Sequence, residues 1–190
     1  MNRIWVLVGG LPGSGKKHLG SEISRHIGLF LDKDTVSRSF SEALLGLLQQ
    51  SVDDRESDVY LEHVRPKEYE TLMDISLENL RLGHSVVCAA PFLQEFFDSR
   101  WRSETELRAE IVDAKVHYVW IDSDEDSLHE RLKKRGESRD RWKLANWTAW
   151  WNSVPKTPPE FDGLKVLDNR IRAARSTSKQ LAELIGMLRG

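Results

Sequence analysis

The chain has 190 residues, enough for a full hydrophobic core, and its 28 basic and 30 acidic side chains give a formal net charge of −2. That balance argues against a protein that binds nucleic acid through overall charge, although a local basic groove is compatible with it. No apolar run approaches the length of a membrane span, the first predicted strand begins too early for a signal peptide, and a single cysteine excludes an internal disulfide. We expect one domain spanning residues 1–190, located in the cytoplasm and without a membrane partner.

A glycine-rich loop between a predicted strand and a predicted helix is the first motif of the chain. The apolar run at residues 4–8 predicts the strand, and apolar residues at helical spacing from Leu19 to Ile27 predict the helix. The loop between them reads GLPGSGK at residues 10–16, which matches the phosphate-binding pattern G-x-x-x-x-G-K known as Walker A. Glycines allow such a loop to turn its N–H groups toward an anion, and Lys16 then reaches the terminal phosphates. The residues that we predict to bind ATP are Gly10, Leu11, Pro12, Gly13, Ser14, Gly15, Lys16, Lys17 and His18.

The last position of this motif departs from the pattern. A Ser or Thr whose hydroxyl holds Mg²⁺ is expected after Lys16, and this chain has Lys17 instead. A protonated lysine offers donors only and cannot ligate a metal. We therefore predict a weakened Mg²⁺ site. The motif alone also leaves open a glycine-rich turn that binds no ligand.

Strand-like and helix-like segments alternate along the rest of the chain. In chain order we predict a strand at 28–31, a helix from about 35 to 48, a polar break at 49–57, a helix from about 66 to 83, strands at 85–90 and 115–121, a helix at 124–135, a strand at 164–167 and a final helix around 181–188. Short apolar strands separated by helices predict an α/β fold with a parallel sheet covered on both faces. Ligands of such sheets bind beyond the carboxyl ends of the strands, so we expect the loops that follow the strands to surround one site.

Two aspartates follow the second predicted strand. Asp32 and Asp34 would face the phosphate loop, where a carboxylate can accept a proton from an attacking hydroxyl or hold Mg²⁺. Arg38 lies one helical turn after Asp34 and can pair with an anionic group on the acceptor. The alternative is that Asp34 only caps a helix beginning at Thr35.

A basic segment follows the helix predicted at 124–135. Arg131 and Arg135 lie one turn apart on that helix, and Arg139 and Arg141 fall in the loop beyond it. Arginines on a mobile loop can cover a phosphoryl-transfer site and neutralise the charge of the moving group. We predict an arginine-bearing lid over about 136–152. The alternative is a solvated basic helix end, which its own helix dipole favours.

Four of the seven tryptophans lie close together in the predicted lid: Trp142, Trp147, Trp150 and Trp151. They are compatible with a stacking surface for an aromatic or sugar-like acceptor. Large aromatic side chains more often pack in a core, so the core of a helical cap over the sheet is the favoured interpretation.

Taken together, these segments resemble the P-loop small-molecule and polynucleotide kinases, a group that includes shikimate and gluconate kinases, chloramphenicol phosphotransferase, polynucleotide 5′-kinase and the zeta-toxin-like kinases. The resemblance rests on GLPGSGK at 10–16, LDKD at 31–34, APF at 90–92 and RLKKRGESRD at 131–140. It implies a three-layer sandwich with a five-stranded parallel sheet, MgATP at the loop, and transfer of the γ-phosphoryl group to a hydroxyl.

The resemblance also implies roles for individual residues. The catalytic residues that it implies are Lys16, Asp34, Arg135 and Arg139. The acceptor contacts that it implies are Asp34, Arg38 and Phe92, and the metal ligand is Asp32. The loop at residues 167–169 would lie beside the adenine. Many members of this group carry an acidic residue that supports Mg²⁺ at the end of the third strand. This chain has Cys88-Ala89-Ala90 there, so a second usual support for the metal is missing.

Our primary hypothesis is an ATP-dependent phosphotransferase that acts on a hydroxyl of an unidentified acceptor, either a small molecule or a nucleic-acid end. The alternative is a nucleotide-binding regulator or pseudokinase with weak or no catalysis, which Lys17 and Ala89 favour. A nucleic-acid-processing NTPase is the least favoured hypothesis, because the net charge is near neutral.

Overall fold

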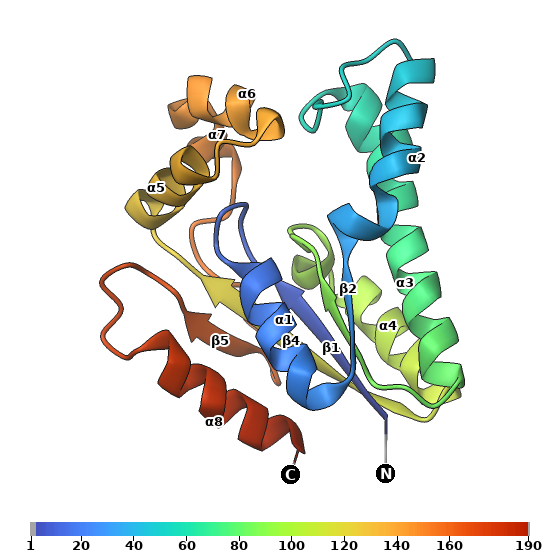
Figure 1. Ribbon diagram of the computed structural model, residues 1–190. Coiled ribbons are helices and arrows are strands. Elements are labelled where there is room, and N and C mark those ends of the chain that lie inside the picture. Colours follow the sequence, from blue (N-terminus) through green and yellow to red (C-terminus); the bar gives the residue numbers. More distant parts are fainter. Residues whose placement is uncertain (1–2, 190) are drawn as a thin grey trace.

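The computed structural model describes residues 3–189 (Figure 1). Its strands are β1 (Arg3–Gly9), β2 (Leu29–Asp32), β3 (Val86–Ala89), β4 (Ala114–Asp122) and β5 (Lys165–Asp168). Its α-helices are α1 (Lys16–Ile27), α2 (Lys33–Leu47), α3 (Arg65–Arg81), α4 (Ser99–Ile111), α5 (Glu125–Arg135), α6 (Arg141–Ala145), α7 (Trp147–Ser153) and α8 (Thr177–Arg189). The π-helix η1 (Tyr60–Val64) precedes α3, and the 3₁₀ helices η2 (Glu95–Phe97) and η3 (Ser138–Asp140) precede α4 and α6. None of the helices in this part of the chain combines the length and the apolar composition needed to span a bilayer.

All five strands form one parallel sheet in the order β2-β3-β1-β4-β5. The central strand β1 pairs on both sides, with Val6 opposite Val87 of β3 and His117 of β4. Parallel pairing brings the carboxyl ends of the strands to one edge, where the loops that follow them meet. The predicted α/β fold with a five-stranded parallel sheet is confirmed.

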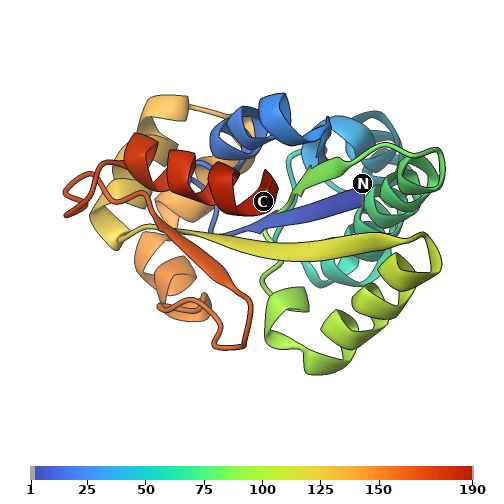
Figure 2. The same ribbon diagram turned by 90° about the horizontal axis from the view of Figure 1, so that it is seen from below.

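Helices cover both faces of this sheet, which gives three layers (Figure 2). The helices α1 and α8 pack on one face, and α3 and α4 pack on the other. Side chains alternate along β1, so that Val6 and Val8 face the first pair of helices while Trp5 and Leu7 face the second. All four are fully buried, which explains why this strand reads as an uninterrupted apolar run.

The helices η2 and α4, between β3 and β4, are absent from the sequence prediction. Only Thr105 and Ala109 of α4 are buried, so the helix has no continuous apolar stripe that a periodicity could detect. Its first turn is instead anchored by an aromatic cluster, in which the rings of Phe92 and Phe96 stack at 5.0 Å and Trp101 lies 5.8 Å from Phe92. Tertiary packing therefore fixes this helix, and local pattern does not.

Two groups of helices stand on either side of the loop between β1 and α1 at the carboxyl edge of the sheet (Figure 1). On one side are α5, α6 and α7. On the other are α2, η1 and the first turns of α3. The loop between β1 and α1 lies at the base of the space between them.

The junction between α1 and β2 gives a test of this packing. A Cβ atom on Gly28 would lie 2.1 Å from the carbonyl oxygen of Ser85, a backbone atom that already accepts a hydrogen bond from Leu29 at 2.9 Å. We expect Gly28→Ala to lower the free energy of unfolding by about 1–3 kcal/mol, measured by urea denaturation, because the strand must shift to relieve the overlap. The matched control is Gly46→Ala near the end of α2, where a Cβ atom meets nothing within 4 Å. That change should raise stability by up to about 1 kcal/mol through helix propensity. Equal stabilities of the two variants would contradict the packing described.

Candidate active site

The loop between β1 and α1 adopts turns that its glycines permit. Gly10, Gly13 and Gly15 have φ values of 140°, 84° and 98°, a region that favours glycine. The Ser14 N–H donates to the Leu11 carbonyl at 3.0 Å and closes a turn. The loop then leads directly into the N-terminus of α1, where the first N–H groups have no partner within the helix. This arrangement can hold an anion.

The loop residues predicted to bind the nucleotide divide between a cavity wall and the layer beneath it. Those that line a cavity of about 650 Å³ are Pro12, Gly13, Gly15, Lys16, Lys17 and His18. Gly10, Leu11 and Ser14 are buried behind this wall, and the Ser14 hydroxyl has no hydrogen-bond partner among residues 3–189. Asn169, in the loop after β5, donates to the Ser14 carbonyl at 2.7 Å and so holds that loop against the phosphate loop.

Lys16 extends over the phosphate loop. Its ammonium donates to the Leu11 carbonyl at 2.8 Å. Burial, assisted by the nearby Arg135 and Arg139 and opposed by Asp34 and Asp32, lowers the pKa of Lys16 to about 7. Without an anion beside it, this lysine is therefore only partly charged near neutral pH.

Lys17 stands where the motif expects a metal-holding hydroxyl, and it pairs with Asp32. Its ammonium lies 3.0 Å from Asp32 Oδ2 and 3.1 Å from the Thr35 hydroxyl oxygen. The same Oδ2 accepts hydrogen bonds from the backbone N–H and the hydroxyl of Thr35, at 3.1 and 2.7 Å. Asp32 is thus the N-cap of α2, which begins at Lys33. The capping role considered for Asp34 is wrong, because the helix starts earlier than the sequence pattern suggests.

The metal side of the phosphate loop offers few oxygen ligands. The Asp32 carboxylate is already neutralised by Lys17, and β3 ends at Ala89, which lines the cavity together with Ala90. Across residues 3–189, no group of three or more His, Cys, Asp and Glu side chains is arranged to hold a metal ion. A Mg²⁺ ion beside nucleotide phosphates takes one or two protein carboxylates, and the carboxylate next to Lys17, that of Asp32, is already paired.

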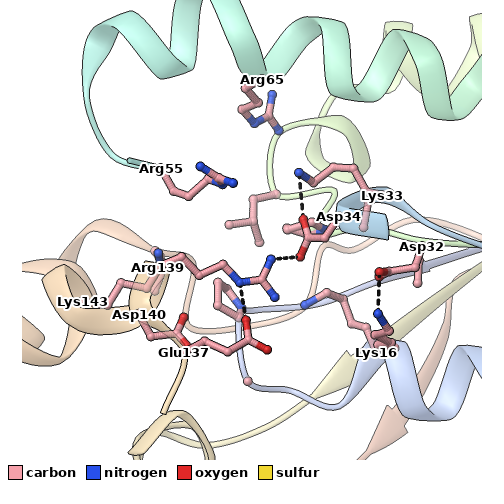
Figure 3. A pocket seen from close by; sticks show the side chains of 18 of the residues that line it. Lys16, Asp32, Lys33, Asp34, Arg55, Arg65, Glu137, Arg139, Asp140 and Lys143 are labelled. Carbon is pink, nitrogen blue, oxygen red and sulfur yellow. Dashed lines mark hydrogen bonds and ion pairs between the residues drawn. The ribbon is translucent and has the colours of Figure 1, made fainter. Parts of the chain in front are cut away.

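Asp34 lies in the cavity between two cations (Figure 3). Its carboxylate is 3.1 Å from the Lys33 ammonium and forms an ion pair with Arg139 of the lid. Burial acts to raise the pKa of Asp34, but Lys33 and Arg139 outweigh it and hold that pKa well below its usual range. Asp34 is therefore ionised at neutral pH and can accept a hydrogen bond from a hydroxyl.

A buried ion pair behind Asp34 is missed by the sequence analysis. Lys33 and Glu68 are only 4% and 2% exposed, and their charged groups pair. Glu68 also accepts hydrogen bonds from the hydroxyls of Ser41 and Tyr60, at 2.8 Å each. Residues 33 and 68 lie on different helices, so no local spacing connects them. The sequence signal for this pair is weak: Glu68 is a charged residue among the apolar residues that α3 turns toward the core.

The predicted lid forms η3, α6 and α7. The two predicted catalytic arginines, Arg135 at the end of α5 and Arg139 in η3, both line the cavity. Arg135 makes a forked pair with the buried Asp140, with N–O distances of 2.8 and 2.7 Å. Arg139 reaches across the cavity to Asp34, a residue 105 positions earlier in the chain. The lid arginines and the phosphate loop thus share one cavity.

Two further polar contacts cross from the lid to the opposite wall. Lys143 of α6 forms an ion pair with Glu56, and the Ser138 hydroxyl donates to Asp53. Both acidic residues belong to the segment between α2 and η1. The two walls are therefore joined above the phosphate loop.

The tryptophan cluster packs the lid onto the phosphate loop. Trp150 is 3% exposed and shares an apolar cluster with Leu11, Leu128 and Leu132. The ring of Trp147 lies 4.9 Å from that of Trp150. The interpretation as the core of a helical cap is confirmed for Trp150, whereas Trp142 is half exposed at the surface.

The two remaining predicted acceptor contacts differ in position. Arg38 of α2 lines the cavity, as do Pro91 and Leu93 in the loop after β3. Phe92 between them is fully buried in the core, stacked on Phe96. The prediction that Phe92 contacts the acceptor is wrong: the chain turns here with φ of 50° at Phe92, and the side chain points beneath the cavity wall.

Solved structures of several kinases share this fold. Mycobacterium tuberculosis APS kinase in complex with AMPPNP and APS is 19% identical, with a TM-score of 0.62 over 100% of this chain and 99% of that chain. A gluconokinase from Sinorhizobium meliloti 1021 is 15% identical, with a TM-score of 0.60 over 99% and 93%. A sugar kinase from Janibacter sp. HTCC2649 is 15% identical, with a TM-score of 0.62 over 100% and 95%. At these identities the likeness shows the P-loop kinase-like fold alone. No curated protein sequence matches the chain significantly.

The family model described as an AAA domain matches residues 5–154. This range includes the phosphate loop, both aspartates of the 31–34 segment and the lid through α7. The chain therefore belongs to the AAA domain family.

Proposed function

We propose that this protein is an ATP-dependent phosphotransferase that moves the γ-phosphoryl group of ATP to a hydroxyl of a second substrate, a small molecule or a nucleic-acid end. One observation carries the proposal. Lys16 of the phosphate loop, Asp34 after β2 and Arg139 of the lid line a single cavity, although the chain separates them widely. A cation at the loop, an ionised carboxylate and a lid arginine around one space are the groups that phosphoryl transfer needs.

Each of these groups has a part in the proposed reaction. The loop N–H groups and Lys16 would hold the β- and γ-phosphates, and Arg135 and Arg139 would neutralise charge on the moving phosphoryl group. Asp34 would accept a hydrogen bond from the acceptor hydroxyl, once Arg139 turns from the carboxylate to the phosphate. A new bond forms between the hydroxyl oxygen and the γ-phosphorus as the bond from that phosphorus to the bridging oxygen breaks and ADP leaves, and the hydroxyl proton passes late to Asp34 and from there to solvent. Because such transition states are loose, positioning by Asp34 matters more than early proton removal.

The ion pair between Lys17 and Asp32 favours one alternative, a nucleotide-binding regulator with weak or no catalysis. Lys17 supplies a positive charge close to the phosphate loop without a metal, and the pair removes the nearest carboxylate from the metal's reach. A protein built in this way would bind a nucleotide with little dependence on Mg²⁺. The two functions differ in turnover, since both require nucleotide binding.

Replacement of Lys16 tests the proposed function. We expect Lys16→Met to reduce ADP formation in the presence of hydroxyl acceptors by about 10²- to 10³-fold, because a charge aimed at the phosphates is lost. Lys179→Met, at an exposed position on α8, serves as the matched control and should retain full activity. Activity of Lys16→Met equal to that of the control would overturn the proposal. Nucleotide binding without turnover in the unaltered protein would instead favour the regulator.

The lowered pKa of Lys16 predicts a proton linkage. At pH 8 the free lysine is mostly neutral, because its pKa is about 7, and bound phosphates raise that pKa. Nucleotide binding should therefore take up nearly one proton at pH 8 and almost none through this residue at pH 6, where Lys16 is charged in both states. Calorimetry of AMPPNP binding in buffers of different ionisation enthalpy measures the uptake. Subtraction of the value for Lys16→Met isolates the lysine, and identical uptake by the two proteins would contradict the assignment.

Restoring the expected hydroxyl tests the role of Lys17. We expect the affinity of the unaltered protein for ATP to change by less than about threefold between buffers with Mg²⁺ and with EDTA, whereas Lys17→Thr should bind at least about tenfold more tightly with Mg²⁺. Lys17→Met is the control, since it removes the charge without adding a ligand. An equally strong Mg²⁺ effect in the unaltered protein would show that a metal site persists beside Lys17.

A further inference from the structure

The cavity is far more basic than the chain as a whole. Ten of the residues that line it are Lys or Arg and five are Asp or Glu, whereas the whole chain has slightly more acidic than basic residues. Part of this excess lies at the phosphate loop and the lid, where a nucleotide accounts for it. The remainder lies on the wall formed by α2, the segment between α2 and η1, η1 itself and the start of α3.

Of the four cations on that wall, Lys33 and Arg65 are matched by the protein itself. Lys33 pairs with Glu68 and Arg65 with Glu95, and Glu56 on the same wall pairs with Lys143 of the lid. Arg65 is held especially firmly, since it donates to both Glu95 oxygens at 2.7 and 2.9 Å and lies 4.3 Å from the centre of the Tyr69 ring. These pairs leave no net charge for a ligand to neutralise.

Arg38 and Arg55 are the exceptions on this wall, because neither has a carboxylate partner among residues 3–189. Arg55 is half-buried, donates to the carbonyls of Val52 and Asp54, and lies 5.2 Å from the centre of the Tyr60 ring. Figure 3 shows Arg55 extending into the cavity from the side opposite Lys16. An arginine that is fixed by carbonyls and a ring, yet lacks a counterion, retains its attraction for an anion.

The position of Arg38 places the second guanidinium close to the proposed reaction centre. It lies four residues after Asp34 on α2, about 6 Å further along the helix axis, and its exposed side chain lines the same cavity. An anion that contacts Arg38 and a hydroxyl that contacts Asp34 can therefore belong to one molecule in this cavity. Because the contacts from the lid to Asp53 and Glu56 join the two walls above this space, it suits a small molecule and not a polymer.

We propose that the phosphoryl acceptor is a small oxyanion, a hydroxyl compound whose phosphate, sulfate or carboxylate group binds between Arg38 and Arg55. This inference rests on the proposed phosphotransferase function and names the class of its second substrate. Arg38 and Arg55 are binding residues in it, and Asp34 receives the hydroxyl.

The test is anion binding to protein already loaded with AMPPNP, so that the phosphate loop is occupied. Inorganic phosphate, sulfate and acetate are titrated separately and followed by NMR. We expect saturable binding of one of them, weakened at least tenfold in both Arg38→Gln and Arg55→Gln. Arg108→Gln, at an exposed position on α4 away from the cavity, should behave like the unaltered protein. The anion that binds most tightly identifies the class, and turnover is then compared for a neutral sugar, its acid and its phosphate ester.

Two results would overturn the inference: no saturable anion binding to the loaded protein, or equal anion affinity in Arg55→Gln and the unaltered protein. Failure of AMPPNP itself to bind would overturn the proposed function instead. In that case the titration is repeated with Lys16→Met, whose phosphate loop lacks its main cation. Anion binding that still depends on Arg38 and Arg55 would support the site, and binding that does not would overturn it.

Discussion

A buried ion pair between α2 and α3 determines the geometry of one whole wall of the cavity. Removal of one partner from a pair as inaccessible as Lys33 and Glu68 costs about 3–5 kcal/mol, because the other charge is then left buried alone. The same Lys33 ammonium holds Asp34, and the same Glu68 carboxylate receives the Tyr60 hydroxyl. Tyr60 in turn supports Arg55. The reactive carboxylate and the arginine across from the phosphate loop are therefore positioned by one interaction.

Internal counterions are the common feature of this site. Asp34 is held by Arg139, Asp140 by Arg135 and Asp32 by Lys17, so most charges have a protein partner before any ligand arrives. A ligand must exchange those pairs for its own, which makes binding depend on the difference between two sets of ionic contacts. Lys17 is the clearest example, because its charge lies at the motif position where a metal-holding hydroxyl is expected.

The sequence was most informative where chemistry is local. The glycine loop, the parallel sheet and the carboxylates after β2 depend on patterns of adjacent residues, and each could be located from them. Three features could not. The capping of α2 depends on where that helix begins, the direction of Phe92 depends on one unusual φ value, and α4 depends on aromatic packing from outside the helix. The buried pair and the contact from Arg139 to Asp34 join residues 35 and 105 positions apart, which no spacing rule can connect.

The apolar cluster around Trp150 attaches the lid more firmly to the phosphate loop than to the opposite wall of the cavity. Trp150 and Leu11 bind the lid helices to the phosphate loop through buried apolar surface, whose disruption costs several kcal/mol. The contacts from the lid to Asp34, Asp53 and Glu56 are polar, and their separation exposes no comparable apolar surface. The weaker seam thus runs between the lid and the α2–η1 side. Opening of the cavity along this seam would keep the lid and the phosphate loop together and would move them relative to the wall that carries Arg38 and Arg55.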